Sequence, residues 1–282
     1  MALFLGIDGG GSGCRAAVAD ASGRILGEGH SGPANIASDL STARLNILAA
    51  TTSALTKALG ADQVAHALPT LSAGLGLAGA NAAGAAEGLR AGLPFARIRV
   101  ETDAIAAVKG ALRGRDGIVA AIGTGSVYAR QLGGVIRQIG GWGLVLGDDG
   151  SGARLGRSLL AEALGAVDGF RPMTPLLQQV LDDHGGTEGV IAFSLSARPA
   201  DFARLAPRIL AADDPAAAGL LAQATADVAA SIAVLQTDPP LPVTCIGGLG
   251  AAYARRLSDR WPVAPALGSA LDGALLLARE AA

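Results

Sequence analysis

Residues 4–20 read FLGIDGGGSGCRAAVAD, an apolar strand that runs into an aspartate, three glycines and a serine before apolar residues resume. Glycine weakens a strand because it has no side chain to pack. It also allows positive φ angles and lets a ligand approach the backbone closely. We therefore expect a ligand to lie against this backbone, and the rest of the chain indicates which ligand it is.

The composition argues against several classes of partner and location. The chain has 282 residues, half of them hydrophobic, enough for one large domain or two ordinary ones. A formal net charge of −2 argues against nucleic acid as the main partner, because binding phosphates needs a basic surface. Cys14 and Cys245 lack metal-ligand spacing, so we expect a reduced, cytoplasmic protein without disulfides. We expect no signal peptide, since the apolar residues 2–7 are too few for one, and no membrane span.

The layout of the first segment returns in residues 117–141, GIVAAIGTGSVYARQLGGVIRQIGG. Both segments predict a buried strand, a loop of glycine and small polar residues, a second strand, a tight turn and a third strand. Two similar hairpin units predict a duplicated α/β architecture with a cleft between its halves. Residues 150–236 have a mostly helical pattern without a counterpart in the first half, so we interpret them as an insertion.

Other segments complete the two halves. Residues 39–59 predict a helix with Asp39 or Ser41 as its N-cap. The segment RIRVETD predicts a short strand that ends at Asp103, a helix follows it, and residues 269–280 predict a closing helix. The positions at helical spacing in the first of these helices are Leu45, Leu48, Ala49, Thr52 and Leu55.

Two glycine loops carry the chemistry that the sequence suggests. The backbone N–H groups and small hydroxyls of Asp8-Gly9-Gly10-Gly11-Ser12 and of Gly123-Thr124-Gly125-Ser126 can cradle phosphate oxygens. Neither loop is a P-loop, because no Gly-Lys-Ser/Thr is present and no helix directly follows. Two ordinary glycine turns are the alternative, but the matched pair, with a third turn at Gly247-Gly248, favours a nucleotide. Asp8, at a strand end, is positioned to hold Mg²⁺ directly or through water.

Taken together, the motifs resemble one family. GIDGGGSGCRAAVAD, AIGTGS, GGWGLVLGDDGSGARLG, CIGGLG and SALDGALLLA occur in the order typical of the BadF/BadG/BcrA/BcrD ATPase family of the sugar kinase, Hsp70 and actin superfamily. Within it the chain is most similar to glucosamine and N-acetylglucosamine kinases. The resemblance implies an α/β fold of two ribonuclease H-like (actin-like ATPase) domains around a central cleft. We expect residues 1–107 with 269–282 to form one domain and residues 108–268 the other.

The resemblance also implies roles for individual residues. The two loops bind the phosphates of ATP, and the second also touches the sugar through Gly125 and Ser126. The family's catalytic aspartate matches Asp103, which orients the attacking hydroxyl and accepts its proton; a helix N-cap is the alternative. The turn that borders the adenosine consists of Gly247, Gly248, Leu249 and Gly250.

A second group of residues is expected to hold the sugar. The amide of Asn35 can donate to and accept from vicinal hydroxyls, and a turn asparagine beside Pro33 is the alternative. The segment GGWG and Asp148 match the family's sugar-binding segment, although a shift to Asp149 stays open. Trp142 offers an apolar face, with a core or interface tryptophan as the alternative. We expect further sugar contacts from Gly141 and Gly143. We interpret Arg255 and Arg256 as a solvent-facing side of a helix, with an approach to the nucleotide as the alternative.

These expectations define a function with ranked alternatives. We expect a kinase that uses ATP and Mg²⁺ to phosphorylate the 6-hydroxyl of glucosamine, because SGPANI and DGFRPMTPLL look closer to bacterial glucosamine kinases. An N-acetylglucosamine kinase is the first alternative. An ATPase activator of a 2-hydroxyacyl-CoA dehydratase, which needs available cysteines for an iron–sulfur cluster, and a non-catalytic nucleotide-dependent regulator are more distant. We expect a homodimer whose ligands are the amino sugar and ATP.

Overall fold

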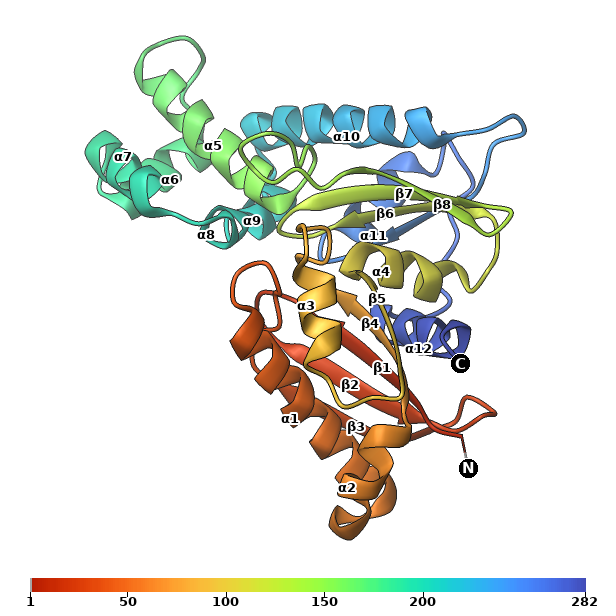
Figure 1. The fold of residues 1–282 in the computed structure, drawn as a ribbon. Coiled ribbons are helices and arrows are strands. Elements are labelled where there is room, and N and C mark those ends of the chain that lie inside the picture. The colour runs from red at the N-terminus through yellow and green to blue at the C-terminus, as the bar shows by residue number, and fades with distance from the viewer. Residues whose placement is uncertain (1) are drawn as a thin grey trace. The chain divides into compact units, whose positions relative to one another are not determined.

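The computed structural model describes residues 2–282, and the chain forms two compact units (Figure 1). Unit 1 consists of Met1–Arg115 and Ala266–Ala282, and unit 2 consists of Asp116–Pro265. The chain therefore leaves unit 1 once, builds the whole of unit 2, and returns to complete unit 1 with its last helix.

Unit 1 is built on a five-stranded sheet with the order β3-β2-β1-β4-β5. Strands β1, β2 and β3 form an antiparallel meander, whereas β1, β4 and β5 run parallel. The register brings Gly9, Leu77 and Thr102 level with one another at the carboxyl ends of the parallel strands. The strands are β1 (Phe4–Gly9), β2 (Cys14–Ala19), β3 (Ile25–Ser31), β4 (Ser72–Leu77) and β5 (Arg97–Thr102).

Helices cover both faces of this sheet. Helix α1 (Leu40–Leu59) packs on β2 and β3, while α12 (Ala270–Glu280) and α4 (Asp103–Leu112) pack on the opposite face over β1 and β4 (Figure 1). The remaining helical segments of the unit are short: η1 (Ala61–Gln63), α2 (Val64–Ala67), η2 (Leu68–Thr70) and α3 (Ala85–Ala91).

The predicted helix over residues 39–59 is confirmed, with Asp39 as its N-cap, but the predicted buried face is wrong. Leu45 is 64% exposed, and among the five predicted positions Leu55 is fully buried. The helix instead turns small residues toward the sheet, since a Cβ at Gly29 would lie 2.0 Å from the Ala50 carbonyl oxygen. Such close backbone approach favours alanine over leucine on the buried face, which consists of Ala43, Ile47, Ala50, Thr51, Ala54 and Leu55.

Unit 2 repeats the strand arrangement of unit 1 on a smaller sheet, with the order β8-β7-β6-β9. Strands β6, β7 and β8 are antiparallel neighbours and β9 runs parallel to β6, as β4 does to β1, so the predicted repeat is confirmed. The strands are β6 (Gly117–Ile122), β7 (Ser126–Leu132), β8 (Val135–Gly140) and β9 (Val243–Ile246).

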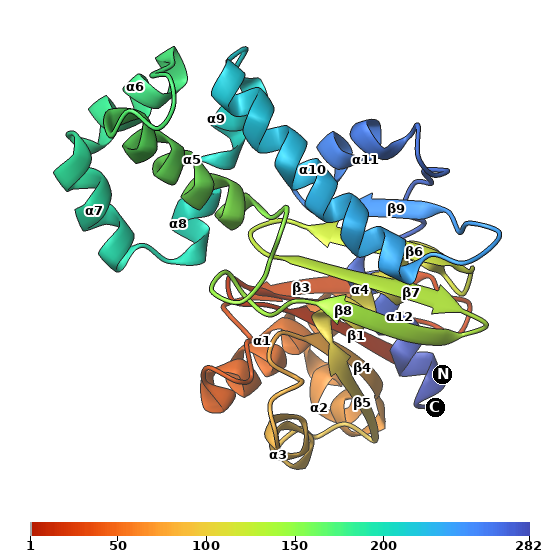
Figure 2. The ribbon, with the colours of Figure 1, turned by 90° about the horizontal axis from the view of Figure 1, so that it is seen from above.

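The predicted helical insertion is present between β8 and β9. Helix α10 lies across β6 and β7, whereas α6 and α7 lie away from the sheet of their unit (Figure 2). Helix α11 (Gly250–Leu257) follows β9. The inserted helices are α5 (Gly152–Val167), α6 (Pro175–His184), α7 (Thr187–Ser196), α8 (Pro199–Ala203), α9 (Ala206–Ala211) and α10 (Pro215–Leu235).

Helix α10 is long and apolar enough to cross a membrane by length and composition alone, with a mean hydropathy of 1.6. One such helix is weak evidence, because a core helix of a globular domain passes the same test. Its apolar side contributes Leu221, Val228, Ile232 and Leu235 to the core of unit 2.

Candidate active site

The first glycine loop connects β1 to β2 and is fixed by its carbonyl groups. The Ala78 N–H donates to the Gly9 carbonyl at 2.8 Å, and the Ala34 N–H donates to the Gly10 carbonyl at 2.9 Å. The N–H groups of Gly11 and Ser12 donate to no group within residues 2–282. Both residues are exposed, so their N–H groups are open to water and available to an external acceptor such as a phosphate oxygen.

Of the two reasons that the sequence suggests for the consecutive glycines, positive φ angles do not apply. Among the described residues, the glycines with positive φ do not include Gly9, Gly10 or Gly11. Gly9 is needed for packing, because a Cβ there would lie 2.6 Å from Leu77 Cδ2. A Cβ on Gly10 or Gly11 would meet nothing within 4 Å. The fold itself therefore does not require these two glycines, whereas close approach of a ligand would.

Asp8 precedes this loop and is paired with an arginine. Asp8 and Arg15 are directly opposite each other on β1 and β2, so their side chains share one face of the sheet. The Arg15 Nε–H donates to Asp8 Oδ2 at 3.2 Å, and Nη2 contacts the same oxygen. Within residues 2–282 no cluster of three or more potential metal ligands exists. A single carboxylate still suits Mg²⁺, which usually keeps waters and binds substrate phosphates.

Asp103 begins helix α4 at the carboxyl end of β5, and the alternative that it is the N-cap is wrong. The N-cap is Thr102, whose side chain accepts a hydrogen bond from the Ile105 N–H at 3.2 Å. Asp103 keeps contact with solvent, yet the protein atoms around its carboxyl desolvate it. That desolvation, together with the negative charge of Asp8, raises the pKa of Asp103 above its ordinary value. Asp103 Oδ1 accepts a hydrogen bond from the Ala104 N–H at 2.9 Å, while the capping bond to Ile105 is made by Thr102.

Asn35 lies in a loop that is attached to the ends of β1 and β4. The Ile36 N–H donates to the Ala78 carbonyl at 3.1 Å, next to the bond between Ala34 and Gly10. Asn35 Oδ1 accepts from the Ala37 N–H at 3.0 Å, so the alternative of a turn asparagine holds for its oxygen. Only the amide nitrogen is left to donate to a ligand.

The second glycine loop, between β6 and β7, is fixed in a similar way. The Gly152 N–H donates to the Gly123 carbonyl at 2.8 Å, and the Ala153 N–H donates to the Thr124 carbonyl at 3.1 Å. In the part of the chain that the structure describes, the N–H groups of Thr124 and Gly125 have no acceptor. Both predicted loops therefore present free backbone donors.

The two neighbouring aspartates of unit 2 have different surroundings. Asp148 is buried with a left-handed backbone (φ 60°), and its carboxylate lies against Gly125, where an added Cβ would be 2.7 Å from Oδ2. Asp149 pairs with Arg154 at 3.5 Å, and its carbonyl accepts from the Ser126 hydroxyl at 2.9 Å. Asp148 has no ion-pair partner among residues 2–282 and remains beside the second loop.

Trp142 is not a core residue, because 72% of it is exposed. Gly141 and Gly143 on either side have positive φ angles, which fix the path of this loop. The exposed side chains of Val145 and Leu146 extend the same apolar segment.

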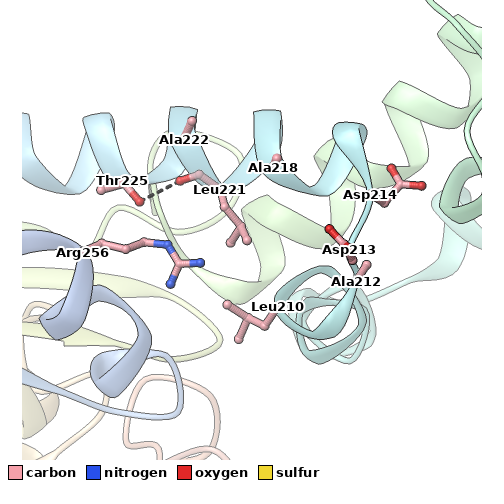
Figure 3. A pocket seen from close by; sticks show the side chains of 9 residues that line it. All are labelled: Leu210, Ala212, Asp213, Asp214, Ala218, Leu221, Ala222, Thr225 and Arg256. Atoms are coloured by element: carbon pink, nitrogen blue, oxygen red, sulfur yellow. Dashed lines mark hydrogen bonds between the residues drawn. The ribbon is translucent and has the colours of Figure 1, made fainter.

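The third glycine turn leads into α11, and Arg256 near the end of this helix lines a pocket. Gly247 has a φ of 88°, and a Cβ on it would clash with the Ile122 carbonyl oxygen, while Gly248 is open. Arg256 on α11 reaches toward Leu210 and Leu221 in a pocket of about 560 Å³ (Figure 3). Arg256 is exposed, in agreement with its interpretation as solvent-facing, and it also lines this pocket. Its lining is Leu210, Ala212, Asp213, Asp214, Ala218, Leu221, Ala222, Thr225 and Arg256.

The cysteines show no sign of a cluster site. Cys14 is 1% exposed and Cys245 is half-buried, and burial raises the pKa of both thiols to about 11. Thiols held protonated in apolar surroundings are unreactive and poor metal ligands.

Comparison with known proteins relates this chain to sugar kinases. A sequence profile of the BadF/BadG/BcrA/BcrD ATPase family matches residues 5–257. Glucosamine kinase GspK of Vibrio cholerae is 33% identical over 99% of this chain and 96% of that protein. An N-acetylmuramic acid/N-acetylglucosamine kinase of Clostridium acetobutylicum is 32% identical over 64% of this chain and 60% of that protein. A crystal structure from Chromobacterium violaceum, described as a candidate N-acetylglucosamine kinase, has a TM-score of 0.86 at 33% identity and covers 99% of both chains, which confirms the predicted fold class.

Proposed function

Because this chain belongs to the BadF/BadG/BcrA/BcrD ATPase family, we propose that it is an ATP-dependent hexosamine kinase that phosphorylates the 6-hydroxyl of glucosamine. The observation that carries the proposal is the carboxylate of Asp103 at the end of β5, level in the sheet with the end of β1, where the loop with unpaired N–H donors begins. In open α/β sheets ligands bind outside the carboxyl ends of the strands, where both groups lie.

Asp103 acts as the general base in this proposal. Its carboxylate orients the sugar hydroxyl and accepts the proton as the oxygen attacks the γ-phosphorus. The free N–H groups of Gly11, Ser12, Thr124 and Gly125 donate to phosphate oxygens. Phosphoryl transfer needs positioning and charge stabilisation more than covalent chemistry, which fixed backbone donors can supply.

Asp8 is the residue that would hold Mg²⁺, through one carboxylate oxygen or a bound water. The ion, when bound, neutralises charge on the phosphates. Asp8 Oδ1 is not used by Arg15, so one carboxylate oxygen is available in addition to the waters that Mg²⁺ retains.

The adenosine is proposed to bind beside Gly247, Gly248 and Gly250, with its base in the pocket lined by Leu210, Leu221 and Arg256. Two aliphatic side chains and a planar guanidinium suit an aromatic ring, because arginine stacks on such faces. The pocket volume of about 560 Å³ is within the range of small-molecule sites.

The proposed sugar contacts come from Asn35, Ser126, Asp148 and the segment Gly141–Gly143. Asp148 is the proposed partner of a protonated amine at C2, because its carboxylate has no ion-pair partner in residues 2–282, whereas Asp149 has Arg154. Asn35 contributes its amide N–H groups, and Trp142 contributes an exposed apolar face.

An N-acetylglucosamine kinase is the second candidate, favoured by the Clostridium acetobutylicum relative and by the Chromobacterium violaceum structure. The activator of a dehydratase is disfavoured by the buried thiols of Cys14 and Cys245. A cytoplasmic location and a homodimer remain predictions.

A coupled assay of ADP release with three sugars tests the proposal. We expect kcat/KM to be highest for glucosamine, since removing its ammonium leaves the Asp148 carboxylate unpaired, and lower for glucose and N-acetylglucosamine. Asp148→Asn should reduce the preference of glucosamine over glucose, with Asp149→Asn as the matched control. If N-acetylglucosamine is preferred about tenfold or more, a difference of roughly 1.4 kcal/mol, the second candidate is correct. If no hexosamine accelerates ADP release, the kinase proposal fails.

A further inference from the structure

Arg15 has no role in the function proposed so far, although it holds the carboxylate assigned to the metal. Its Nε and Nη2 both contact Oδ2 of Asp8. The Asp8 side chain is only 17% exposed, while that of Arg15 is 51% exposed, so the guanidinium covers the carboxylate on its solvent side. Nη1 of Arg15 has no partner within residues 2–282.

The guanidinium also lines a cavity that opens on the first glycine loop. This cavity has a volume of about 390 Å³ and is lined by Ser12, one of the two residues with a free N–H, and by the adjacent loop residues Gly10 and Gly13. Arg15 is opposite Asp8 on one side and opposite His30 on the other, so all three side chains project from the same sheet face. The remaining lining residues are Cys14 and Ser31.

The charges at this loop need a cation beyond the metal. P-loop enzymes use a lysine of the loop to bind phosphates, and the loop of residues 8–13 contains neither lysine nor arginine. Arg15 is the nearest such cation along the chain, and a guanidinium binds phosphate oxygens with two N–H groups. In the same cavity the Asp8 carboxylate would repel a polyphosphate unless a cation lay between them.

We propose that Arg15 is a phosphate-binding residue that exchanges partners: it neutralises Asp8 when the site holds no nucleotide, and it turns to the polyphosphate when Mg²⁺ and nucleotide bind. This inference rests on the proposed nucleotide-binding function. It predicts that Arg15 and Mg²⁺ are alternative counter-charges of Asp8. Nucleotide affinity should therefore depend most on Arg15 when Mg²⁺ is absent, and most on Mg²⁺ when Arg15 is replaced.

Calorimetric titration of ADP into the full chain, once with EDTA and once with saturating Mg²⁺, tests this exchange. With EDTA, Arg15→Met should weaken ADP binding about 10- to 100-fold, because no other counter-charge then separates the Asp8 carboxylate from the phosphates. With saturating Mg²⁺, Arg15→Met should weaken ADP binding by at most about a third of the factor found in EDTA. The reason is that Mg²⁺ then neutralises the Asp8 carboxylate in place of Arg15. Arg15→Lys should lie between, since it keeps the charge but not the paired N–H geometry.

The control is Arg24→Met, which removes another exposed arginine of the same antiparallel meander, paired with Asp20 at 3.3 Å. It should leave both affinities unchanged. Adding Asp8→Asn to Arg15→Met should restore part of the EDTA affinity, because the repelling charge is gone. Should Arg15→Met unfold, as judged by thermal melting, the same comparison is made with Arg15→Lys.

Equal losses with and without Mg²⁺, or wild-type affinity of Arg15→Met in EDTA, would overturn the exchange while leaving the kinase proposal intact. If the wild-type chain binds ADP in neither buffer, the proposed nucleotide site itself fails, and the role of Arg15 fails with it.

Discussion

At the scale of single residues, Asp103 is the group whose chemistry decides the proposal. We expect Asp103→Asn to lower kcat by about 10²- to 10⁴-fold, because an amide keeps the shape but cannot accept the proton. Affinity for Mg²⁺ and ADP should change little, which calorimetry can measure alongside the coupled assay. A variant with nearly wild-type kcat would contradict the assignment of the base.

The neighbouring N-cap supplies the matched control. Thr102→Ala removes the side chain that accepts from the Ile105 N–H, so it should cost about 1 kcal/mol of unfolding free energy. Its kcat should stay close to wild type, whereas Asp103→Asn should lower kcat with little effect on stability.

The pH dependence of kcat follows from the surroundings of Asp103. Desolvation and the negative charge of Asp8 raise the pKa of Asp103. As pH falls, the ionised carboxylate and with it kcat should therefore be lost at a higher pH than for an ordinary aspartate.

Single residues also show the limits of prediction from sequence. The two loops and Asp103 were predictable because glycine runs and a carboxylate at a strand end are local patterns. The pairing of Asp8 with Arg15 depends on strand register, and the availability of Asp103 depends on which residue caps α4. Neither register nor cap position follows from residue types alone, since both Thr102 and Asp103 are good N-caps.

At the scale of elements, the sequence indicated the strands of both hairpin units and the strand that ends at Asp103, but it misplaced the buried face of α1. The helical spacing of the apolar residues predicts that leucines form the buried face of α1. Because the glycines of β3 have no side chains, the helix backbone instead lies close to the sheet, and alanines make the contact. The pocket at Arg256 does not follow from the sequence either, because its walls come from three separate helices, α9, α10 and α11, whose packing against one another is not a local pattern.

Close packing of α4 on α12 gives the first prediction about elements. A Cβ on Gly110 would lie 1.8 Å from the Ser269 carbonyl oxygen, and one on Gly273 would lie 1.8 Å from that of Ala106. Because backbone atoms cannot yield as a flexible side chain does, Gly110→Ala should lower the unfolding free energy by about 1–3 kcal/mol in urea denaturation.

The control for this substitution is Gly219→Ala in α10, where a Cβ would meet nothing within 4 Å. It should stabilise the protein by about 0.5–1 kcal/mol, since glycine in a helix interior is unfavourable relative to alanine. A similar effect of the two substitutions would show that the backbones of α4 and α12 are not in contact.

The pocket between α10 and α11 gives the second prediction about elements. Ala222→Trp fills part of the space beside Leu221 and Arg256, so it should raise KM for ATP about tenfold while the KM for the sugar stays the same. Ala226→Trp, an exposed position of α10 outside the pocket lining, is the control. Steady-state kinetics with each substrate varied in turn separates the two effects, and an unchanged KM for ATP would remove the base from this pocket.

At the scale of the whole molecule, the repeat of strand layout was readable because each copy carries its own glycine loop and turn. Each sheet extends from its antiparallel meander to a parallel strand, β4 in unit 1 and β9 in unit 2. The proposed reaction uses residues from both units: Asp103 belongs to unit 1, and Thr124 and Asp148 belong to unit 2.

Because the proposed reaction uses residues of both units, the bound substrates have to bring these residues to the distances that the reaction requires. Phosphoryl transfer requires the attacking hydroxyl within about 3–3.5 Å of the phosphorus and the exclusion of competing water. We therefore expect glucosamine with a non-hydrolysable ATP analogue to reduce the radius of gyration in small-angle X-ray scattering, and either ligand alone to reduce it less. Asp103→Asn, which keeps the binding groups, should show the same reduction. An unchanged radius with both ligands bound, as verified by calorimetry, would contradict a closure of the units around their substrates.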